Sequence, residues 1–223
     1  MAEPGTIEDA LACVIQRGLR SLASEEEIQA WEGEQDVRNR RERLASSGID
    51  ERLDAEGAEA IIRDRALDTR ALQLVRAWVA SSRPALVLLG DRGQGKTVAA
   101  AWALARCAGR YVRASDLSEM REAGWRQREA YQRHLRTELL VVDELGTEAD
   151  VTAAARTLQD VVDARQRLPR RTLMLGNQMM REELAERYDP RTLDRLGTSG
   201  DEHGIALFRL LRGRSLRAGA SAR

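Results

Sequence analysis

Cysteine and histidine are scarce in this 223-residue sequence, and the shortage limits the kinds of site that it can build. The two cysteines, Cys13 and Cys107, lie far apart and lack the paired spacing of a zinc site or a small disulfide scaffold. His134 and His203 are also isolated, whereas a metal site needs several ligands close together. We therefore expect a protein of a reducing compartment, the cytoplasm, without a zinc centre.

Long apolar segments are absent as well. No apolar run approaches the ~18 residues that a membrane-spanning helix requires, and residues 1–18 carry acidic side chains where a secretory signal needs basic ones. These absences predict a protein that is neither exported nor inserted in a membrane. The 43% hydrophobic and 32% charged residues are typical of a globular chain with one full-sized core and a small extension.

Neither sign of charge is in excess, because the 36 basic residues balance 36 acidic ones. A net charge of zero gives no overall reason to bind nucleic acid, so such binding has to come from local clusters of arginine. Lysine is almost missing: of the 36 basic residues, 35 are arginine, and the single lysine is Lys96. The surroundings of this one lysine therefore need an explanation.

The first residues predict a small helical extension. Apolar residues recur at helical spacing over residues 7–22, and a second, highly charged helix is expected from Ser24 onward. Two helices this polar make a poor core alone, so residues 1–45 should pack either on the main domain or on a partner protein. The turn-rich residues 46–50 mark the predicted boundary with a main domain over residues 46–223.

The main domain alternates apolar and helical segments. Residues 58–82 have helical periodicity, which ends at Arg83-Pro84. Short apolar segments then alternate with helical patterns, and the predicted strands are residues 85–90, 110–114, 138–144, 172–177 and 204–210. Such alternation predicts a parallel sheet covered by helices on both faces.

A phosphate-binding loop is predicted between the first of these strands and a helix over residues 95–107. Gly90, Gly95, Lys96 and Thr97 satisfy the pattern G-x-x-x-x-G-K-[ST], with an apolar strand before it and a helix after it. In such a loop, backbone N–H groups and the helix N-terminus surround the phosphates of a nucleotide. The residues predicted to bind it are Gly90, Asp91, Arg92, Gly93, Gln94, Gly95, Lys96, Thr97 and Val98.

The loop explains the single lysine. Lys96 would contact the β and γ phosphates, and the Thr97 hydroxyl would hold magnesium. A compact ammonium fits where a planar guanidinium is too broad, so arginine cannot replace lysine here. With 36 basic positions, chance would place the only lysine here in about one case in 36. The alternative is a tight strand-to-helix turn that binds nothing.

Two acidic residues complete the predicted site. The apolar strand at residues 138–144 ends in Asp143 and Glu144, which places both carboxylates at the carboxyl edge of the sheet, beside the loop. Asp143 would hold magnesium together with Thr97, and Glu144 would orient and polarise the attacking water. The alternative is a strand that ends in two acids by accident. The two motifs together predict binding and hydrolysis of a nucleotide.

Six motifs in this order resemble the DnaC/IstB group of AAA+ ATPases, which are bacterial and phage helicase loaders and transposition helpers. They are GDRGQGKT, LLVVDELG, VVDAR, TLMLGNQ, YDPRTLDRL and RGRSLR, within residues 46–217. The resemblance implies an α/β fold: an AAA+ P-loop NTPase core with a five-stranded parallel sheet between helices, no sizeable C-terminal lid, and the small N-terminal helical extension. Asp50, Gly176 and Val98-Ala99 depart from the family pattern, which bears on the turn before the core and on the fine geometry of the site.

The resemblance also implies roles for single residues. Asn177 is similar to the polar sensor that helps to position the attacking water. Arg195 resembles the arginine finger, which reaches the γ-phosphate of a neighbouring subunit, so a homo-oligomer is expected in the ATP state. Arg217, with Arg214 as the alternative, resembles the second sensor. Outside such a pattern, an arginine in this chain is an ordinary surface charge.

A cluster of arginines with two aromatic residues lies between the second and third predicted strands, in residues 121–136. Arginine supplies phosphate contacts and aromatic rings supply stacking faces, as in sites for single-stranded DNA. The alternative is a charged amphipathic helix whose Trp and Tyr pack inward. The predicted DNA contacts are Arg121, Trp125, Arg126, Arg128, Tyr131 and Arg133.

These observations predict an ATPase that acts in DNA replication as a helicase loader. Residues 1–45 would bind a replicative DNA helicase, while the core binds ATP, Mg2+ and single-stranded DNA. The first alternative is an IstB-like transposition helper with a transposase as its partner. A P-loop kinase of a small molecule is a further alternative, and it would need an acceptor pocket and a basic lid. A scaffold that binds nucleotide without hydrolysis would not need Glu144.

Overall fold

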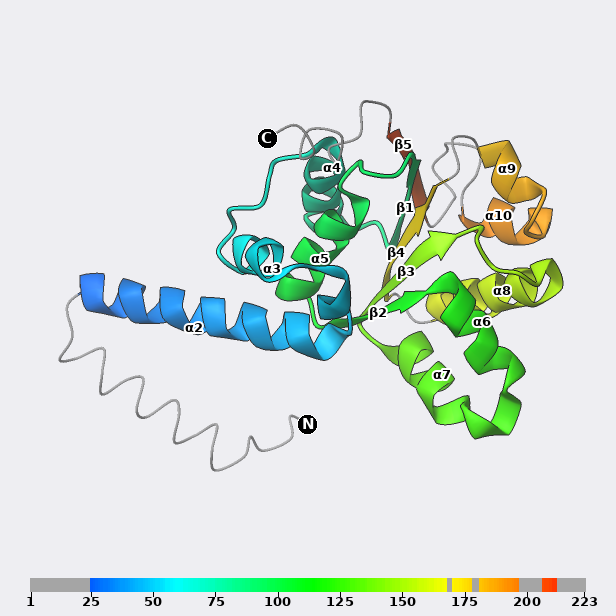
Figure 1. Ribbon diagram of the computed structural model, residues 1–223, viewed down its shortest axis with the longest axis horizontal. Coiled ribbons are helices and arrows are strands. Elements are labelled where there is room, and N and C mark those ends of the chain that lie inside the picture. Colours follow the sequence, from blue (N-terminus) through cyan, green and yellow to red (C-terminus); the bar gives the residue numbers. More distant parts are fainter. Residues whose placement is uncertain (1–24, 168–169, 178–180, 197–205, 212–223) are drawn as a thin grey trace. The chain divides into compact units, whose positions relative to one another are not determined.

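A computed structural model describes residues 25–167, 170–177, 181–196 and 206–211 (Figure 1). The chain divides into two compact units, Met1–Asn39 and Arg40–Arg223. Helix α2 (Glu25–Ser47) accounts for all described residues of the first unit and continues into the second. The domain boundary predicted between residues 45 and 46 stays a prediction. The features predicted outside the described residues are the helix over residues 7–22, Cys13, His203, Arg214 and Arg217.

The second unit is built on a five-stranded parallel sheet. Its strands are β1 (Ala85–Gly90), β2 (Gly109–Arg113), β3 (Leu139–Leu145), β4 (Arg171–Gly176) and β5 (Ala206–Leu211). Their order is β2-β3-β4-β1-β5, and each neighbouring pair is parallel. Every residue of β1 is buried, as expected of a strand covered on both faces. The predicted five-stranded parallel sheet is confirmed.

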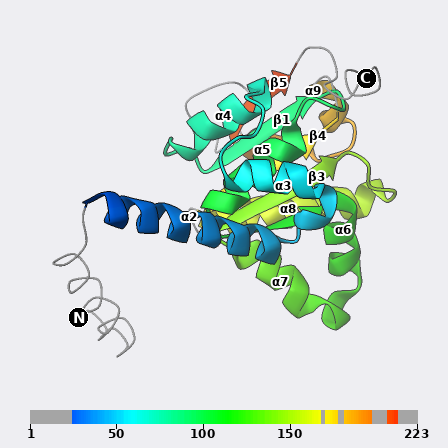
Figure 2. The ribbon, with the colours of Figure 1, turned by 60° about the vertical axis from the view of Figure 1, so that its left-hand side comes forward.

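Helices cover both faces of this sheet (Figures 1 and 2). One face carries α3 (Ala55–Ile62), α4 (Arg70–Val79) and α5 (Lys96–Arg106). The other face carries α6 (Ala114–Glu122), α7 (Arg128–Arg136), α8 (Val151–Arg167), α9 (Arg181–Ala185) and α10 (Pro190–Leu196). None of the helices in the described part of the chain is long and apolar enough to span a lipid bilayer.

The helical stretch predicted over residues 58–82 is in fact two helices, α3 and α4. Asp64 adopts a left-handed backbone conformation with φ +59° after α3, and its carboxylate accepts a hydrogen bond from Trp102 Nε1 over 2.8 Å. Thr69 then begins α4, because its Oγ1 accepts from Leu72 N over 3.1 Å. The apolar spacing continues across the break, so periodicity alone did not reveal it.

Gly90, the last residue of β1, has a conformation that a side chain would not tolerate. Its φ is +139°, and a Cβ added there would lie 2.5 Å from the carbonyl oxygen of Leu211 and 2.9 Å from its Cβ. Leu211 is the partner of Gly90 in the neighbouring strand β5. The close approach of β5 therefore requires glycine at the point where the chain leaves β1.

We expect Gly90→Ala to lower the free energy of unfolding by about 2–4 kcal/mol, because overpacking and an unfavourable positive φ act together. Urea denaturation followed by circular dichroism measures the change. Gly33→Ala in α2 is the matched control, because a Cβ there meets no atom within 4 Å. Equal unfolding midpoints for Gly90→Ala and the parent would show that β5 can move away at little cost.

Candidate nucleotide-binding site

A cavity of about 510 Å³ lies at the carboxyl edge of the sheet. Carboxyl ends of parallel strands meet at one edge, so residues distant in sequence gather there. Its lining residues are Arg52, Arg92, Gly93, Gln94, Gly95, Lys96, Thr97, Val98, Asp143, Glu144, Thr147 and Asn177. The structure thus brings the predicted loop, the two acidic residues and the predicted sensor Asn177 around one space.

The loop between β1 and α5 has the backbone form of an anion site. Gly93 and Gly95 have φ values of +81° and +78°, and a Cβ at Gly95 would lie 3.0 Å from Thr69 Oγ1. Helix α5 starts at the next residue, and its N-terminus has no side-chain cap. Its first N–H groups are therefore left for a ligand, and phosphate is the group that such loop and helix ends commonly bind.

Lys96 is buried at the floor of this loop, with 7% of its surface exposed. Its Nζ donates to the carbonyl oxygens of Gly90 and Asp91 over 2.6 and 2.8 Å. Burial lowers the pKa of the ammonium, and the nearby charges of Asp143 and Asp91 oppose this effect. Of the nine predicted loop residues, Gly90 and Asp91 thus contact Lys96, while the other seven line the cavity.

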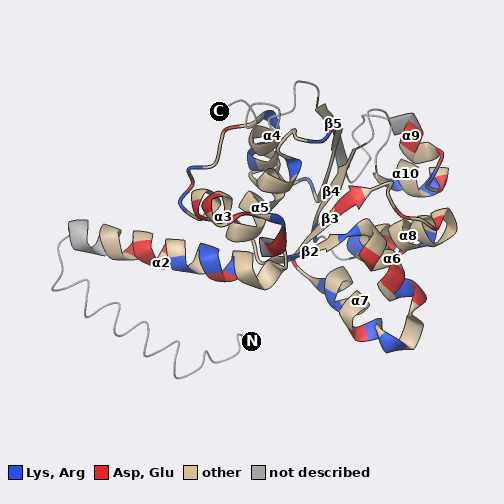
Figure 3. Cartoon of the chain, in the orientation of Figure 1, with Lys and Arg blue, Asp and Glu red and all other residues tan. Residues whose placement is uncertain are grey.

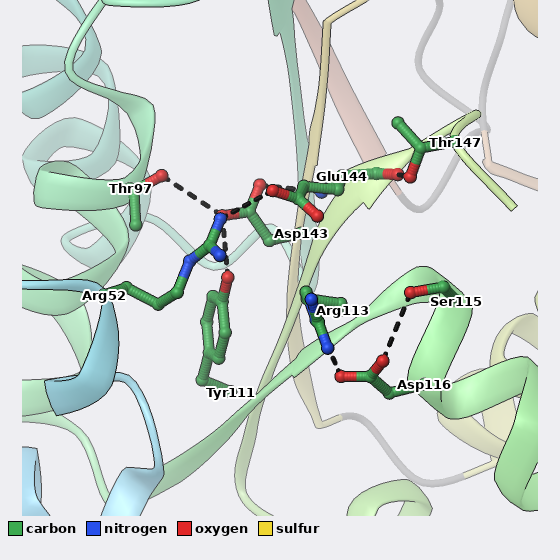
Figure 4. A network of polar contacts seen from close by, with 9 residues as sticks. All are labelled: Arg52, Thr97, Tyr111, Arg113, Ser115, Asp116, Asp143, Glu144 and Thr147. Atoms are coloured by element: carbon green, nitrogen blue, oxygen red, sulfur yellow. Dashed lines mark hydrogen bonds and ion pairs between the residues drawn. The ribbon is translucent and has the colours of Figure 1, made fainter.

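Asp143 is a buried carboxylate with three hydrogen bonds (Figure 4). Its Oδ2 accepts from the hydroxyls of Thr97 and Tyr111, each over 3.1 Å, and its Oδ1 accepts from Glu144 N over 2.7 Å. Burial raises the pKa of Asp143, and the three donors oppose this effect. The adjoining oxygens of Thr97 and Asp143 are of the type that magnesium prefers, so these residues fit the predicted metal role.

The backbone of Glu144 has an unusual conformation. Its φ is +59°, and the pairing of β3 with β4 shifts in register between Val142 and Leu145. Its Oε1 accepts from Arg52 Nη2 over 2.6 Å, as Figure 4 shows. Sequence reasoning did not identify Arg52, because one arginine among 35 carries no signal of its own. It also missed Tyr111 and Thr147.

Arg195 lies on α10 and does not line the cavity of its own chain. Its guanidinium is exposed and pairs with Asp163 on α8. The structure therefore separates Arg195 from the other predicted site residues. The predicted second sensor, Arg217 or Arg214, lies outside the described residues.

The segment predicted to bind DNA, residues 121–136, spans the end of α6, a 3-10 helix at Gly124–Arg126, and α7. Trp125 is 84% exposed, and the guanidinium of Arg126 lies 5.8 Å from its ring centroid. Tyr131 is only 7% exposed, and its hydroxyl donates to Asp160 over 3.3 Å. The prediction that Tyr131 offers a stacking face was wrong, because helical spacing places it with the buried Leu135 on the inner side of α7.

The remaining arginines of this segment differ in their surroundings. Arg121 forms ion pairs with Asp160 and Glu122 over 2.8 and 2.9 Å, whereas Arg126 and Arg128 are exposed. Arg110, Arg133 and Arg136 line an open hollow of about 480 Å³, and Figure 3 shows basic residues along α7. We call these three arginines and their hollow the α7 basic hollow.

His134 lies beside the α7 basic hollow and titrates below its ordinary range. Burial lowers its pKa to about 4, with Arg110 and Arg133 adding to the effect. The folded state therefore binds fewer protons than the unfolded state between pH 4 and 6.5. The resulting stability is present above pH 6.5 and is lost as the pH falls towards 4.

We expect His134→Gln to reduce the loss of stability in acid by about 2 kcal/mol between pH 7.5 and 4.5. Urea denaturation of both proteins at the two pH values measures the change in the free energy of unfolding. The contribution of the carboxylates is the same in both proteins, so it cancels when the two changes are compared. The same acid sensitivity in the variant would show that His134 is protonated in the folded protein.

Comparisons with known proteins give one family and several solved structures. The family model described as IstB-like ATP binding protein matches residues 26–193. The DnaC helicase loader has a TM-score of 0.52 at 19% identity, over 64% of this chain and 89% of that chain. DnaI has a TM-score of 0.50 at 20% identity, over 66% and 82%. AMPPCP-bound DnaA from Aquifex aeolicus has a TM-score of 0.51 at 14% identity, and the match covers 65% of this chain and 48% of that chain. At these identities the structures share the fold. No curated protein matches closely enough to count as a relative.

Proposed function

Because this chain belongs to the family of IstB-like ATP-binding proteins, we propose that it is a Mg2+-dependent ATPase that loads a replicative DNA helicase. The observation that carries the ATPase part of this proposal is the convergence of Lys96, Thr97, Asp143, Glu144 and Asn177 on one cavity. Family membership supports the binding of ATP. The two carboxylates at the end of β3 support its hydrolysis, because a site that only holds phosphate has no use for Glu144.

Each of these cavity residues would have its own role in ATP hydrolysis. The backbone N–H groups of the loop and the ammonium of Lys96 would hold the phosphates. Thr97 and Asp143 would hold magnesium, which when bound neutralises phosphate charge. Glu144 would orient the attacking water and take its proton, and Asn177 would donate a hydrogen bond that keeps this water in place.

Arg195 is proposed to complete the site of a neighbouring subunit in the ATP state. Its position outside its own cavity supports this role. In mixtures of Arg195→Ala and Glu144→Gln subunits, some interfaces would pair an intact Glu144 with an intact Arg195, so hydrolysis should partly recover. Mixtures as inactive as the two variants alone would contradict a finger that acts between subunits. Arg217, or Arg214, remains the proposed second sensor.

Single-stranded DNA is proposed to bind at Trp125, Arg126 and Arg128, with Arg133 reaching from the α7 basic hollow. The ring of Trp125 is exposed, as a stacking platform must be. Arg121 and Tyr131 are no longer proposed as contacts, because Asp160 engages both of their side chains.

We expect Trp125→Ala combined with Arg126→Ala to weaken binding of a fluorescent oligonucleotide about 10- to 100-fold, because one stacked base and one phosphate contact are lost. Fluorescence anisotropy at several salt concentrations measures both the affinity and the salt dependence. Arg63→Ala is the matched control, since Arg63 is an exposed arginine at the end of α3 that pairs with Glu59. Equal weakening by Arg63→Ala would indicate nonspecific binding.

The partner is proposed to be a hexameric replicative helicase, bound through residues 1–45 in the cytoplasm. A transposase is the second candidate, because the matching family is named after IstB. The kinase alternative has no observation in its favour.

The deciding experiment immobilises the full-length chain with ATP and presents a purified replicative helicase and a purified transposase separately. Retention of the helicase, lost on deletion of residues 1–39, is the expected result, because this deletion removes the first compact unit and leaves the buried Leu44 in place. Retention of the transposase alone would overturn the loader proposal.

A further inference from the structure

The ion pair between Arg52 and Glu144 connects the segment after α2 to the carboxylate that we assign to water activation. Arg52 Nη2 lies 2.6 Å from Glu144 Oε1, although the two residues are 92 positions apart. Both side chains line the same cavity. Arg52 is the last residue of the 3-10 helix Asp50–Arg52, and Glu144 stands near the end of β3. The fold therefore brings a cation from outside the two sequence motifs to the water-activating residue.

Buried residues fix the backbone that carries Arg52. Ile49 is fully buried, and Leu44 and Ser47 are nearly so. Ser47 Oγ donates to Leu44 O over 2.6 Å and accepts from Ile49 N over 3.3 Å. Arg52 N then donates to Ile49 O over 2.9 Å. The guanidinium is thus presented from a fixed turn.

Glu144 is constrained from its own side as well. Its φ of +59° lies in the left-handed region, which is unfavourable for a residue with a Cβ. Such conformations persist where the surrounding structure enforces them, and they are common at functional sites. The hydrogen bond from Glu144 N to Asp143 Oδ1 is one such constraint. With the backbone held, the side-chain torsions are the main freedom left to the carboxylate, and Arg52 restrains them.

We propose that Arg52 is a positioning residue that restrains Glu144 and thereby limits the rate of ATP hydrolysis, an inference that rests on the hydrolytic function proposed above. In hydrolysis, the water oxygen forms a bond to the γ-phosphorus, the bond from this phosphorus to ADP breaks, and Glu144 takes the proton of the water. Taking the proton neutralises the carboxylate, so its attraction to Arg52 is lost. The ion pair thus stabilises the ground state more than the transition state, which slows the reaction.

The exposure of the pair sets the size of the effect. The side chains of Arg52 and Glu144 are 37% and 32% exposed, and solvent weakens ion pairs of this kind. Removing the pair should therefore raise the turnover number about fivefold, not by several powers of ten.

The first test is the steady-state kinetics of Arg52 variants with Mg2+ and ATP. Arg52→Ala should raise kcat about fivefold while KM and the affinity for a non-hydrolysable ATP analogue stay unchanged. Arg52→Lys keeps the charge but loses the fork geometry, so its kcat should be intermediate. In a Glu144→Gln background, Arg52→Ala should have no effect on kcat. Arg63→Ala is the matched control, because Arg63 is an exposed arginine that pairs with Glu59 and does not line the cavity, and its kcat should be unchanged.

Three results would overturn the proposal. A lower kcat with unchanged analogue affinity would mean that Arg52 holds Glu144 in its productive orientation. Weaker binding of the analogue would assign Arg52 to the nucleotide instead of Glu144. An unchanged kcat would show that the pair does not influence hydrolysis.

A second test does not depend on turnover. Urea unfolding of the nucleotide-free parent, Arg52→Ala, Glu144→Gln and the double variant forms a double-mutant cycle. We expect a coupling of about fivefold in the unfolding equilibrium constant, and strictly additive effects would overturn the contact. If the coupling is present but neither the parent nor Arg52→Ala hydrolyses the ATP that it binds, the ATPase proposal fails and the rate-limiting role of Arg52 fails with it, whereas the contact stands.

Discussion

Glu144→Gln should lower the rate of ATP hydrolysis about 10²- to 10⁴-fold, the range typical of a lost general base. Glutamine keeps the shape of the side chain and can still accept a hydrogen bond, but it cannot take a proton from water. The loop, Lys96 and Thr97 remain in place, so the binding of ATP should persist. Release of phosphate under saturating ATP measures the first quantity, and calorimetric titration with an ATP analogue measures the second.

Glu148→Gln is the matched control for this change. Glu148 is another glutamate and follows the end of β3. It is buried, accepts a hydrogen bond from Tyr188 Oη over 2.7 Å, and does not line the cavity. Its replacement should therefore leave catalysis largely intact in the protein that folds. Hydrolysis by Glu144→Gln within a factor of two of the parent rate would remove Glu144 from the proposed reaction.

Lys96→Ala should weaken the binding of ATP about 30- to 1,000-fold, because one partner of a buried charge pair with the phosphates is lost. Lys96 is buried at the loop, and its Nζ lies against the carbonyl oxygens of Gly90 and Asp91. Because Lys96 also lines the cavity, an anionic ligand there would compete with these two carbonyl oxygens for the ammonium. Calorimetric titration with Mg2+ and an ATP analogue measures the affinity.

Lys96→Arg separates charge from shape. The guanidinium retains the positive charge but is too broad for the space that the ammonium occupies, so this variant should also bind ATP poorly. Circular dichroism and urea unfolding of both variants establish that the loss is not a failure to fold. Full affinity in Lys96→Ala would contradict the assignment of the loop, and full affinity in Lys96→Arg would contradict the steric explanation for the single lysine.

β1, β3 and β4 were predictable because nearly all of their residues are buried, on both faces of the sheet. β1 has the predicted bounds, and β3 differs from the predicted segment by one residue at each end. The break between α3 and α4 was not predictable from periodicity, since it depends on Asp64 and its distant partner Trp102. The spacing of apolar residues predicts which side of a helix is buried, but it does not predict polar contacts between segments that are distant in sequence.

The same limit applies to the site. Lys96, Asp143 and Glu144 could be placed from sequence because each stands in a short motif at the end of a strand, where the topology decides its position. Arg52 and Tyr111 reach the same carboxylates from other segments, and neither stands in the two motifs at the strand ends. The burial of Tyr131 likewise depends on how α7 packs, which composition does not reveal.

Lys96 also determines how the chain responds to amine-reactive reagents. It carries the only side-chain amine in 223 residues, so acylation of a lysine side chain can occur only at the floor of the phosphate loop. The extent of this single modification, read by mass spectrometry, reports whether the loop is occupied without any label on the protein or on the nucleotide.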